Sequence, residues 1–157
     1  MKPLIRQNRV VADEWRHIDD TQPLPDTGPC SVSLERWKAE HRQLLEHPDR
    51  LGVRLGPQGE PADLADTLDD LALIVVEFPA FTDGRGFSQA RQLRVRLGYQ
   101  GELRAYGPLL RDQLPMLAHC GFDSFDLTTE TDLEQALRAF NMFTVDYSSL
   151  WGRSAHV

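Results

Sequence analysis

An almost continuous apolar segment in the middle of the chain, residues 71–78 (LALIVVEF), constrains the fold more than any other stretch. A half-buried strand alternates apolar and polar residues, whereas a strand covered on both faces of a parallel sheet reads as an unbroken apolar run. This segment therefore predicts a central strand of a parallel sheet. It is also far too short to cross a bilayer, so we expect no membrane insertion.

Strand-like and helix-like segments alternate around this strand. Further strands are predicted near residues 53–55, 102–106 and 123–127, and helices at about 33–46, from Pro61, at about 87–97, at about 109–119 and from a capping box at 131–134. Such alternation is typical of right-handed βαβ units. We predict a single α/β domain with an open, mainly parallel sheet or a partial barrel-like array, because 157 residues are too few for a complete eightfold barrel.

The two ends of the chain differ from this pattern. Residues 1–30 are predicted to be an N-terminal extended element and linker, with a short hairpin or an extended edge around Gln7 and Asn8, and the α/β domain is assigned to residues 31–157. The C-terminal segment 143–151 is unusually apolar for a terminus. It is expected either to cover a sheet edge or to pair with a second copy in a homo-oligomer.

Charge is distributed unevenly along the chain. The net charge is −7, yet residues 83–104 carry five arginines against two carboxylates, a local balance of +3 that leaves −10 on the remainder. An acidic protein with a cationic patch is poorly suited to nucleic acid and better suited to a small anion or an acidic partner. The alternative is a solvated helix face whose arginines form surface ion pairs.

The loops that follow strands 71–78 and 102–106 should emerge at the same edge of a parallel sheet, where α/β proteins place ligand sites. Arg85 and Arg91 would contact an anionic ligand or an acidic partner, and Asp83 and Asp112 would orient them. Two alternatives remain open: an Arg–Asp network that only staples loop to helix, and a buried ion pair for Arg104. The residues expected to converge on one cleft are Asp83, Arg85, Ser88, Arg91, Arg104, Asp112 and Gln113.

Most catalytic templates are missing from the sequence. Residues 83–89 lack the third glycine of a dinucleotide-binding loop, and no phosphate-binding loop with a lysine is present. The two cysteines cannot supply the four thiolates of an iron–sulfur cluster, and the histidines have no zinc spacing. We therefore expect no cofactor and no metal and assign no catalytic residue. The first twenty residues hold no signal-peptide core, and Cys30 and Cys120 are not spaced as a pair, which favours a cytoplasmic, reduced protein.

Several motifs together resemble a known bacterial family. Residues 81–91 (FTDGRGFSQAR), 93–105 (LRVRLGYQGELRA), 112–113 and 120–123 (CGFD) are similar to domain of unknown function 934, over about residues 50–127. Pro115 departs from the helix former expected in that family. Family members are encoded beside the sulfite reductase of assimilatory sulfate reduction, so the resemblance implies a role in sulfite reduction.

Two functions are compatible with that resemblance. The first is an accessory protein of sulfite reduction that binds a small anion such as sulfite, or sulfite reductase itself, through the arginine-rich loop. The second is an oxidoreductase of the same pathway with a borrowed or unrecognised redox cofactor. A coloured purified protein would favour the second. The sequence leaves open whether the chain catalyses any reaction.

Overall fold

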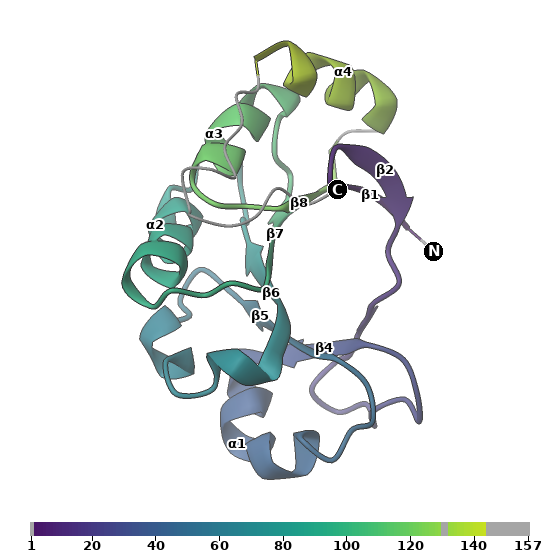
Figure 1. Cartoon of the computed structure of the whole chain (residues 1–157), viewed down its shortest axis with the longest axis vertical. Coiled ribbons are helices and arrows are strands. Elements are labelled where there is room, and N and C mark those ends of the chain that lie inside the picture. Colours follow the sequence, from purple (N-terminus) through teal and green to yellow (C-terminus); the bar gives the residue numbers. More distant parts are fainter. Residues whose placement is uncertain (1, 130–131, 144–157) are drawn as a thin grey trace.

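An eight-stranded sheet organises the computed structural model, which describes residues 2–129 and 132–143 (Figure 1). The strand order across the sheet is β2-β1-β8-β7-β6-β5-β4-β3. The strands are β1 Pro3–Arg6, β2 Arg9–Ala12, β3 Arg16–His17, β4 Cys30–Ser33, β5 Leu51–Leu55, β6 Leu71–Glu77, β7 Glu102–Gly107 and β8 Ser124–Leu127.

From β3 to β8 each strand is parallel to the next, which confirms the predicted α/β fold. The four predicted strands are β5 to β8, and β6 lies between β5 and β7 with its apolar run buried. β3 and β4 were not predicted. β4 has only four residues, two of them serines, so it carries no apolar pattern that distinguishes it from the preceding linker.

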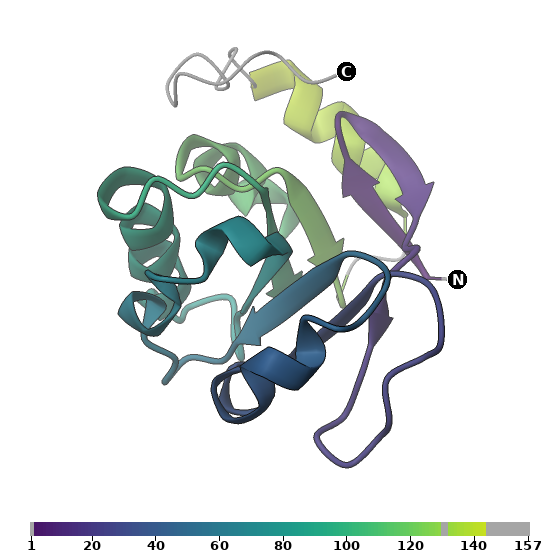
Figure 2. The ribbon, with the colours of Figure 1, turned by 60° about the horizontal axis from the view of Figure 1, so that its bottom comes forward.

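The N-terminal residues form a hairpin that joins the same sheet. β1 and β2 are antiparallel, and Gln7 and Asn8 between them have φ angles of +50° and +65°, as a two-residue hairpin turn requires. β1 also pairs antiparallel with β8, placing Ile5 opposite Phe125. Figure 2 shows the hairpin beside the helix Leu133–Phe143 (α4).

The helical connections are short. They are α1 Leu34–Leu44, the 3₁₀ helices η1 Pro61–Leu64 and η2 Leu68–Asp70, α2 Arg85–Arg91, the π-helix η3 Gln92–Arg96, the 3₁₀ helix η4 Arg111–Gln113, and α3 Leu114–His119, before α4. Ser33 caps α1 as predicted, its hydroxyl accepting the Arg36 N–H at 3.1 Å. The continuous helix predicted from Pro61 is wrong: two 3₁₀ turns fill the ten residues before β6 begins at Leu71.

Two predictions about the later helices are refined by the structure. Pro115 lies in the first turn of α3, where a missing N–H has no intrahelical partner, so the helix starts late instead of kinking. At α4, Asp132 accepts the Gln135 N–H at 3.0 Å. Thr131, the predicted cap, and the apolar tail 144–151 lie outside the described residues.

The two faces of the sheet have opposite character. Figure 1 shows α1, α2 and α3 along one side of the sheet, where they cover apolar side chains such as Val53, Ile74 and Leu103. The other face is largely polar. None of the helices in the described ranges is long and apolar enough to span a bilayer.

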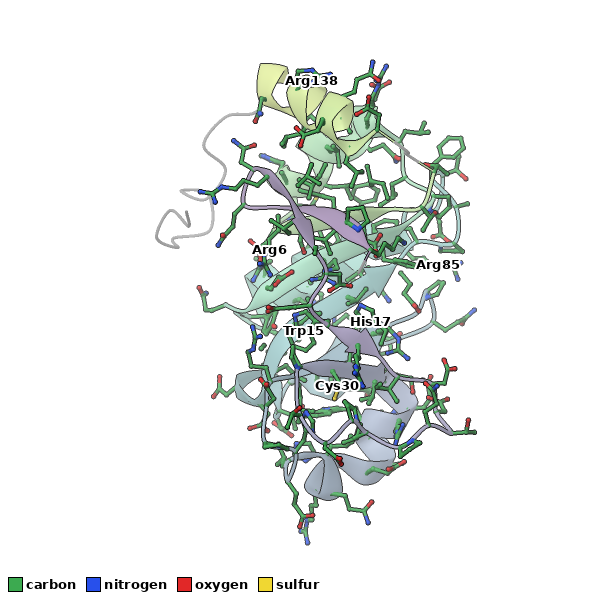
Figure 3. The ribbon with its side chains drawn as sticks, turned by 90° about the vertical axis from the view of Figure 1, so that its right-hand side faces the viewer. Arg6, Trp15, His17, Cys30, Arg85 and Arg138 are labelled. Atoms are coloured by element: carbon green, nitrogen blue, oxygen red, sulfur yellow. The ribbon has the colours of Figure 1, made fainter. Side chains whose placement is uncertain are left out.

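Residues 13–18, which we call the strap, cross the polar face (Figure 3). Only residues 13–15 link β2 to β3, although these strands lie at opposite ends of the strand order, so the sheet is curled and its two edges approach each other. Trp15 is buried against Leu73 and Val75, and the Ile18 N–H bonds the Ser31 carbonyl at 2.9 Å. The strap therefore covers the side of the sheet opposite α1, α2 and α3 (Figure 1).

Gly107, at the end of β7, lies directly against the backbone of Phe78, which follows β6, and a substitution can test this close approach. Gly107 has a φ of +145°, and a Cβ there would collide with the carbonyl oxygen of Phe78. We expect Gly107→Ala to lower the free energy of unfolding by more than about 2 kcal/mol in urea melts. Gly84→Ala is the matched control, since its Cβ would meet open space, and should change stability by less than about 0.5 kcal/mol. Equal melts would contradict the close approach of β6 and β7.

Candidate functional site

The loop after β6 contains a local ion pair. The carboxylate of Asp83 accepts hydrogen bonds from the Arg85 backbone N–H at 3.0 Å, from Nε at 3.0 Å and from Nη2 at 2.6 Å. These hydrogen bonds lower the pKa of the Asp83 carboxyl to about 2. The Arg85 side chain remains 53% exposed, so the pair shapes the loop while leaving the guanidinium accessible to a partner.

Gln113 joins this loop to the loop after β7. Its Nε2 donates to the Phe81 carbonyl at 2.9 Å, and its Oε1 accepts the Leu110 N–H at 2.9 Å. One amide thereby holds together two backbones that are far apart in the sequence. Asp112 is exposed beside it in η4. Asp83, Arg85, Asp112 and Gln113 are thus on two loops that meet at the carboxyl edge of the sheet.

Ser88 and Arg91 lie further along α2. With Gln92, Val95 and Arg96 they line a hollow of about 260 Å³ on the outer side of α2 and η3. Val95 is 57% exposed, and within the described part of the chain neither Arg91 nor Arg96 forms an ion pair. The lining contains no carboxylate. This surface is cationic with an apolar centre.

Arg104 does not belong to this edge. It lies in the middle of β7 on the polar face of the sheet, because its neighbours Leu103 and Ala105 point into the helix-covered core. Its side chain is 1% exposed and lies 3.1 Å from Asp13, 2.9 Å from Glu102 and 3.3 Å from the Ser124 hydroxyl. Arg104 therefore forms the buried ion pair of the alternative prediction. It does not join the other residues that were expected in one cleft.

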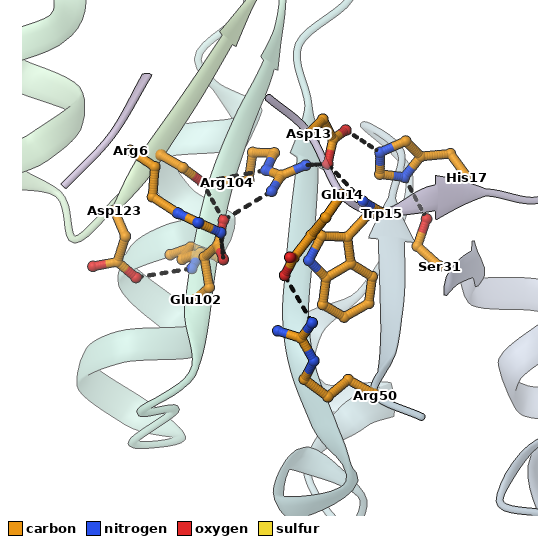
Figure 4. A network of polar contacts seen from close by, with 12 residues as sticks. Arg6, Asp13, Glu14, Trp15, His17, Ser31, Arg50, Glu102, Arg104 and Asp123 are labelled. Carbon is orange, nitrogen blue, oxygen red and sulfur yellow. Dashed lines mark hydrogen bonds and ion pairs between the residues drawn. The ribbon is translucent and has the colours of Figure 1, made fainter. Parts of the chain in front are cut away.

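Asp13 of the strap is the partner that sequence reasoning missed (Figure 4). Its carboxylate also accepts the Trp15 N–H at 3.0 Å and lies 2.8 Å from His17 Nε2. Burial alone would raise the pKa of the Asp13 carboxyl, but the His17 hydrogen bond, the Arg104 charge and the Trp15 N–H together lower that pKa to about 2. Asp13 is therefore ionised at neutral pH and pairs the strap with β7.

The same network continues to β4 and β5. His17 Nδ1 lies 2.6 Å from the Ser31 hydroxyl, which also accepts a hydrogen bond from Arg54 Nη1 at 2.8 Å. A serine, a histidine and an aspartate linked in this order are the groups that nucleophilic catalysis uses. Ser31 is fully buried, however, and its oxygen is held by Arg54, so no substrate can reach it. The arrangement is a structural link between strap and sheet.

Arg94 is a second buried arginine that the sequence did not reveal. Its guanidinium donates to Asp123 at 2.6 Å and to the carbonyls of Gly121, Tyr99 and Gly101 at 2.8–2.9 Å. The π-helix η3, closed by the Leu97 N–H on the Gln92 carbonyl, turns Arg94 inward and Val95 outward. Helical spacing already places Arg94 on the side of buried Ala90 and Leu93 and places Val95 on the opposite side, so the sequence carried a signal for the direction of both side chains but none for the partners of Arg94.

A hollow of about 400 Å³ also opens at the carboxyl ends of β4, β5 and β6. Its lining carries the carboxylates of Asp19, Asp20, Glu35 and Glu77 and a single cation, Arg54, whose Nη1 and Nη2 donate to Ser31 and Ile18. A small anion such as sulfite would be repelled there. No cluster of potential metal ligands occurs among the residues that the structure describes, and both cysteines are free thiols.

Comparison with known proteins identifies the family. Residues 52–156 match the model of a family of bacterial proteins of unknown function, DUF934. The chain belongs to the DUF934 family. No curated protein matches it. The DUF934 match includes the arginine-rich surface, the Gln113 bridge and Arg104, whereas Asp13 and the rest of the strap precede it.

Substitution of Arg104 and of Arg85 compares a buried ion pair with an exposed one in this DUF934 protein. Arg104→Ala leaves Asp13 and Glu102 without their buried counter-charge and should lower the free energy of unfolding by about 3–5 kcal/mol. Arg85→Ala removes an exposed pair and should leave the free energy of unfolding nearly unchanged. Thermal and urea melts measure both. A large loss of stability for Arg85→Ala would instead show that the Asp83–Arg85 pair has a structural role in holding the loop against α2.

The ionisation of Asp13 gives a pH test. Because folding lowers its pKa from 3.8 to about 2, ionised Asp13 stabilises the folded state above its unfolded pKa, and that contribution is lost as the pH falls through about 2. The stability difference between the parent and Asp13→Asn should be constant above about pH 5 and narrow as the pH approaches 2. Urea melts at several pH values measure it, and a constant difference down to pH 2 would contradict the assignment.

Proposed function

We propose that this protein is a cytoplasmic accessory protein of assimilatory sulfite reduction that docks an acidic surface of sulfite reductase with the outer side of α2 and η3. The pathway comes from the family resemblance. The observation that carries the docking mode is the hollow in which exposed Arg91 and Arg96 flank exposed Val95 without a neighbouring carboxylate. Arginine beside apolar side chains is typical of protein interfaces.

The charge distribution supports a protein partner over a free anion. Of the five arginines in residues 83–104, Arg94 and Arg104 are buried in ion pairs, and Arg85, Arg91 and Arg96 are exposed. Of the exposed three, Arg85 is paired with Asp83, whereas Arg91 and Arg96 line one hollow together with exposed Val95. A small anion would contact only the two guanidinium groups, whereas a protein surface can contact the two cations and the apolar side chain together.

The backbone at this surface is also unusual. A π turn is rare and occurs frequently at functional sites. Here Arg94 holds it through hydrogen bonds to Asp123 and to the carbonyls of Gly121, Tyr99 and Gly101, so the surface around exposed Val95 is ordered before any partner arrives. A surface that is already ordered loses less conformational entropy on binding.

Charge reversal tests the proposal. Purified protein should bind sulfite reductase purified from the same bacterium, and Arg91→Glu combined with Arg96→Glu should weaken binding at least about tenfold in titration calorimetry, because like charges would then face each other. Arg42→Glu, an exposed arginine on α1, is the matched control and should bind like the parent. The double variant should also fail to restore growth on sulfate in a deletion strain.

Three results would contradict the proposal. One is absence of binding by the parent protein. Another is equal binding by the double variant and the Arg42→Glu control. The third is tight binding of sulfite alone that requires Arg91 and Arg96, which would replace the protein partner with a small anion.

A further inference from the structure

A second hollow adjoins the one that Arg91 and Arg96 line, which we call the arginine hollow. The second has a volume of about 330 Å³ and lies between η2 and the turn that follows η3. We call it the aspartate hollow, because Asp66 and Asp69 are the charged residues of its lining. Arg96 lines the arginine hollow and the next residue, Leu97, lines the aspartate hollow. A positive and a negative hollow are therefore neighbours on the surface.

Buried Tyr99 fixes the two hollows relative to each other. Its hydroxyl donates to the carbonyl of Leu71, the residue that follows η2, at 3.1 Å. Its backbone N–H donates to the carbonyl of Leu93, within η3, at 2.9 Å. The segment that carries the two aspartates is thus tied to the helix that carries the two arginines. A surface held in this way loses little conformational entropy when it binds.

The charges of both hollows are uncompensated. Within the part of the chain that the structure describes, neither the two arginines nor the two aspartates form an ion pair, and all four residues are exposed. Neither lining contains a charge of the opposite sign. Each hollow also has an apolar part: Val95, 57% exposed, in the arginine hollow, and half-buried Leu68 and Leu97 in the aspartate hollow. In charge the two hollows are opposite, and in both the charges lie beside apolar side chains.

We propose that this face forms a symmetric dimer, in which the arginine hollow of each copy lies against the aspartate hollow of the other. A two-fold axis at the boundary between the hollows places opposite charges against each other twice, so one surface is complementary to itself. Val95 of each copy then enters the aspartate hollow of the other and packs against Leu68 and Leu97. Apolar contact at the centre with charge pairs around it is the usual composition of a protein interface.

The overall charge opposes this contact only weakly. Two copies that each carry a net charge of −7 repel each other at long range. At physiological ionic strength that repulsion is screened beyond about 8 Å, whereas the charges facing each other across the interface are closer than this. The dimer covers the surface that docks sulfite reductase, so self-association and docking exclude each other. The dimer itself does not depend on the proposed function.

Two double variants and their mixture test the dimer by sedimentation equilibrium over a wide range of protein concentrations. Arg91→Glu with Arg96→Glu, and Asp66→Lys with Asp69→Lys, each place like charges against each other and should weaken dimerisation at least about tenfold. An equimolar mixture of the two variants should dimerise again. In the mixed dimer both contacts join opposite charges, which a merely misfolded variant could not restore.

The matched control is Asp26→Lys with Glu46→Lys. It changes the net charge as much as the aspartate variant does, on exposed residues outside both hollows, and should dimerise like the parent. A parent that stays monomeric would refute the dimer, as would variants that dimerise like the parent or a mixture that stays monomeric. Open-ended assemblies in place of dimers would refute the two-fold arrangement.

Sulfite reductase is absent from these measurements, so their failure leaves the docking proposal standing. The Asp66→Lys with Asp69→Lys variant separates the two further. It keeps the arginine hollow intact and should bind sulfite reductase at least as tightly as the parent does, because no dimer competes for the surface. Weaker binding by this variant would contradict the competition between dimer and partner.

Discussion

The ion pair between Arg104 and Asp13 is the contact on which the rest of the structure depends. Arg104 is buried in the middle of the sheet, and a buried guanidinium is tolerated only when opposite charges and hydrogen-bond acceptors surround it. Glu102 and Ser124 come from neighbouring positions of the sheet, but Asp13 comes from the strap. The sheet therefore needs the strap to neutralise Arg104, and the strap needs Arg104 to neutralise buried Asp13.

A second buried arginine shapes the opposite side of the molecule. Arg94 ties η3 to the turn between α3 and β8 and fixes the π turn that exposes Val95. The two buried arginines also remove positive charge from the surface, so the cationic region is narrower than the sequence indicates. What remains at the hollow is exposed Arg91 and Arg96 beside exposed Val95, a combination that fits recognition of another protein.

Two polar features of the described residues lie apart from the proposed interface. Ser31, His17 and Asp13 form a hydrogen-bonded series, yet Arg54 holds the serine oxygen and the serine has no access to solvent. The hollow at the carboxyl ends of β4, β5 and β6 is acidic and suits no small anion. The surface with apolar and cationic groups lies on α2 and η3, and the proposed interface uses this surface.

The sequence by itself determined the parallel α/β core, because residues 71–78 are apolar without interruption and the segments around them alternate at the spacing of βαβ units. It also placed Asp83, Arg85 and Gln113 at one edge, since loops after parallel strands share an edge. Only the tertiary structure decided which arginines are exposed. Helical spacing places Arg94 on the apolar side of its helix, but a buried guanidinium is stable there only because Asp123 and carbonyls up to 27 residues away accept its hydrogen bonds. The burial of Arg104 depends likewise on Asp13, and contacts between residues so distant in the chain leave no periodic signal in it.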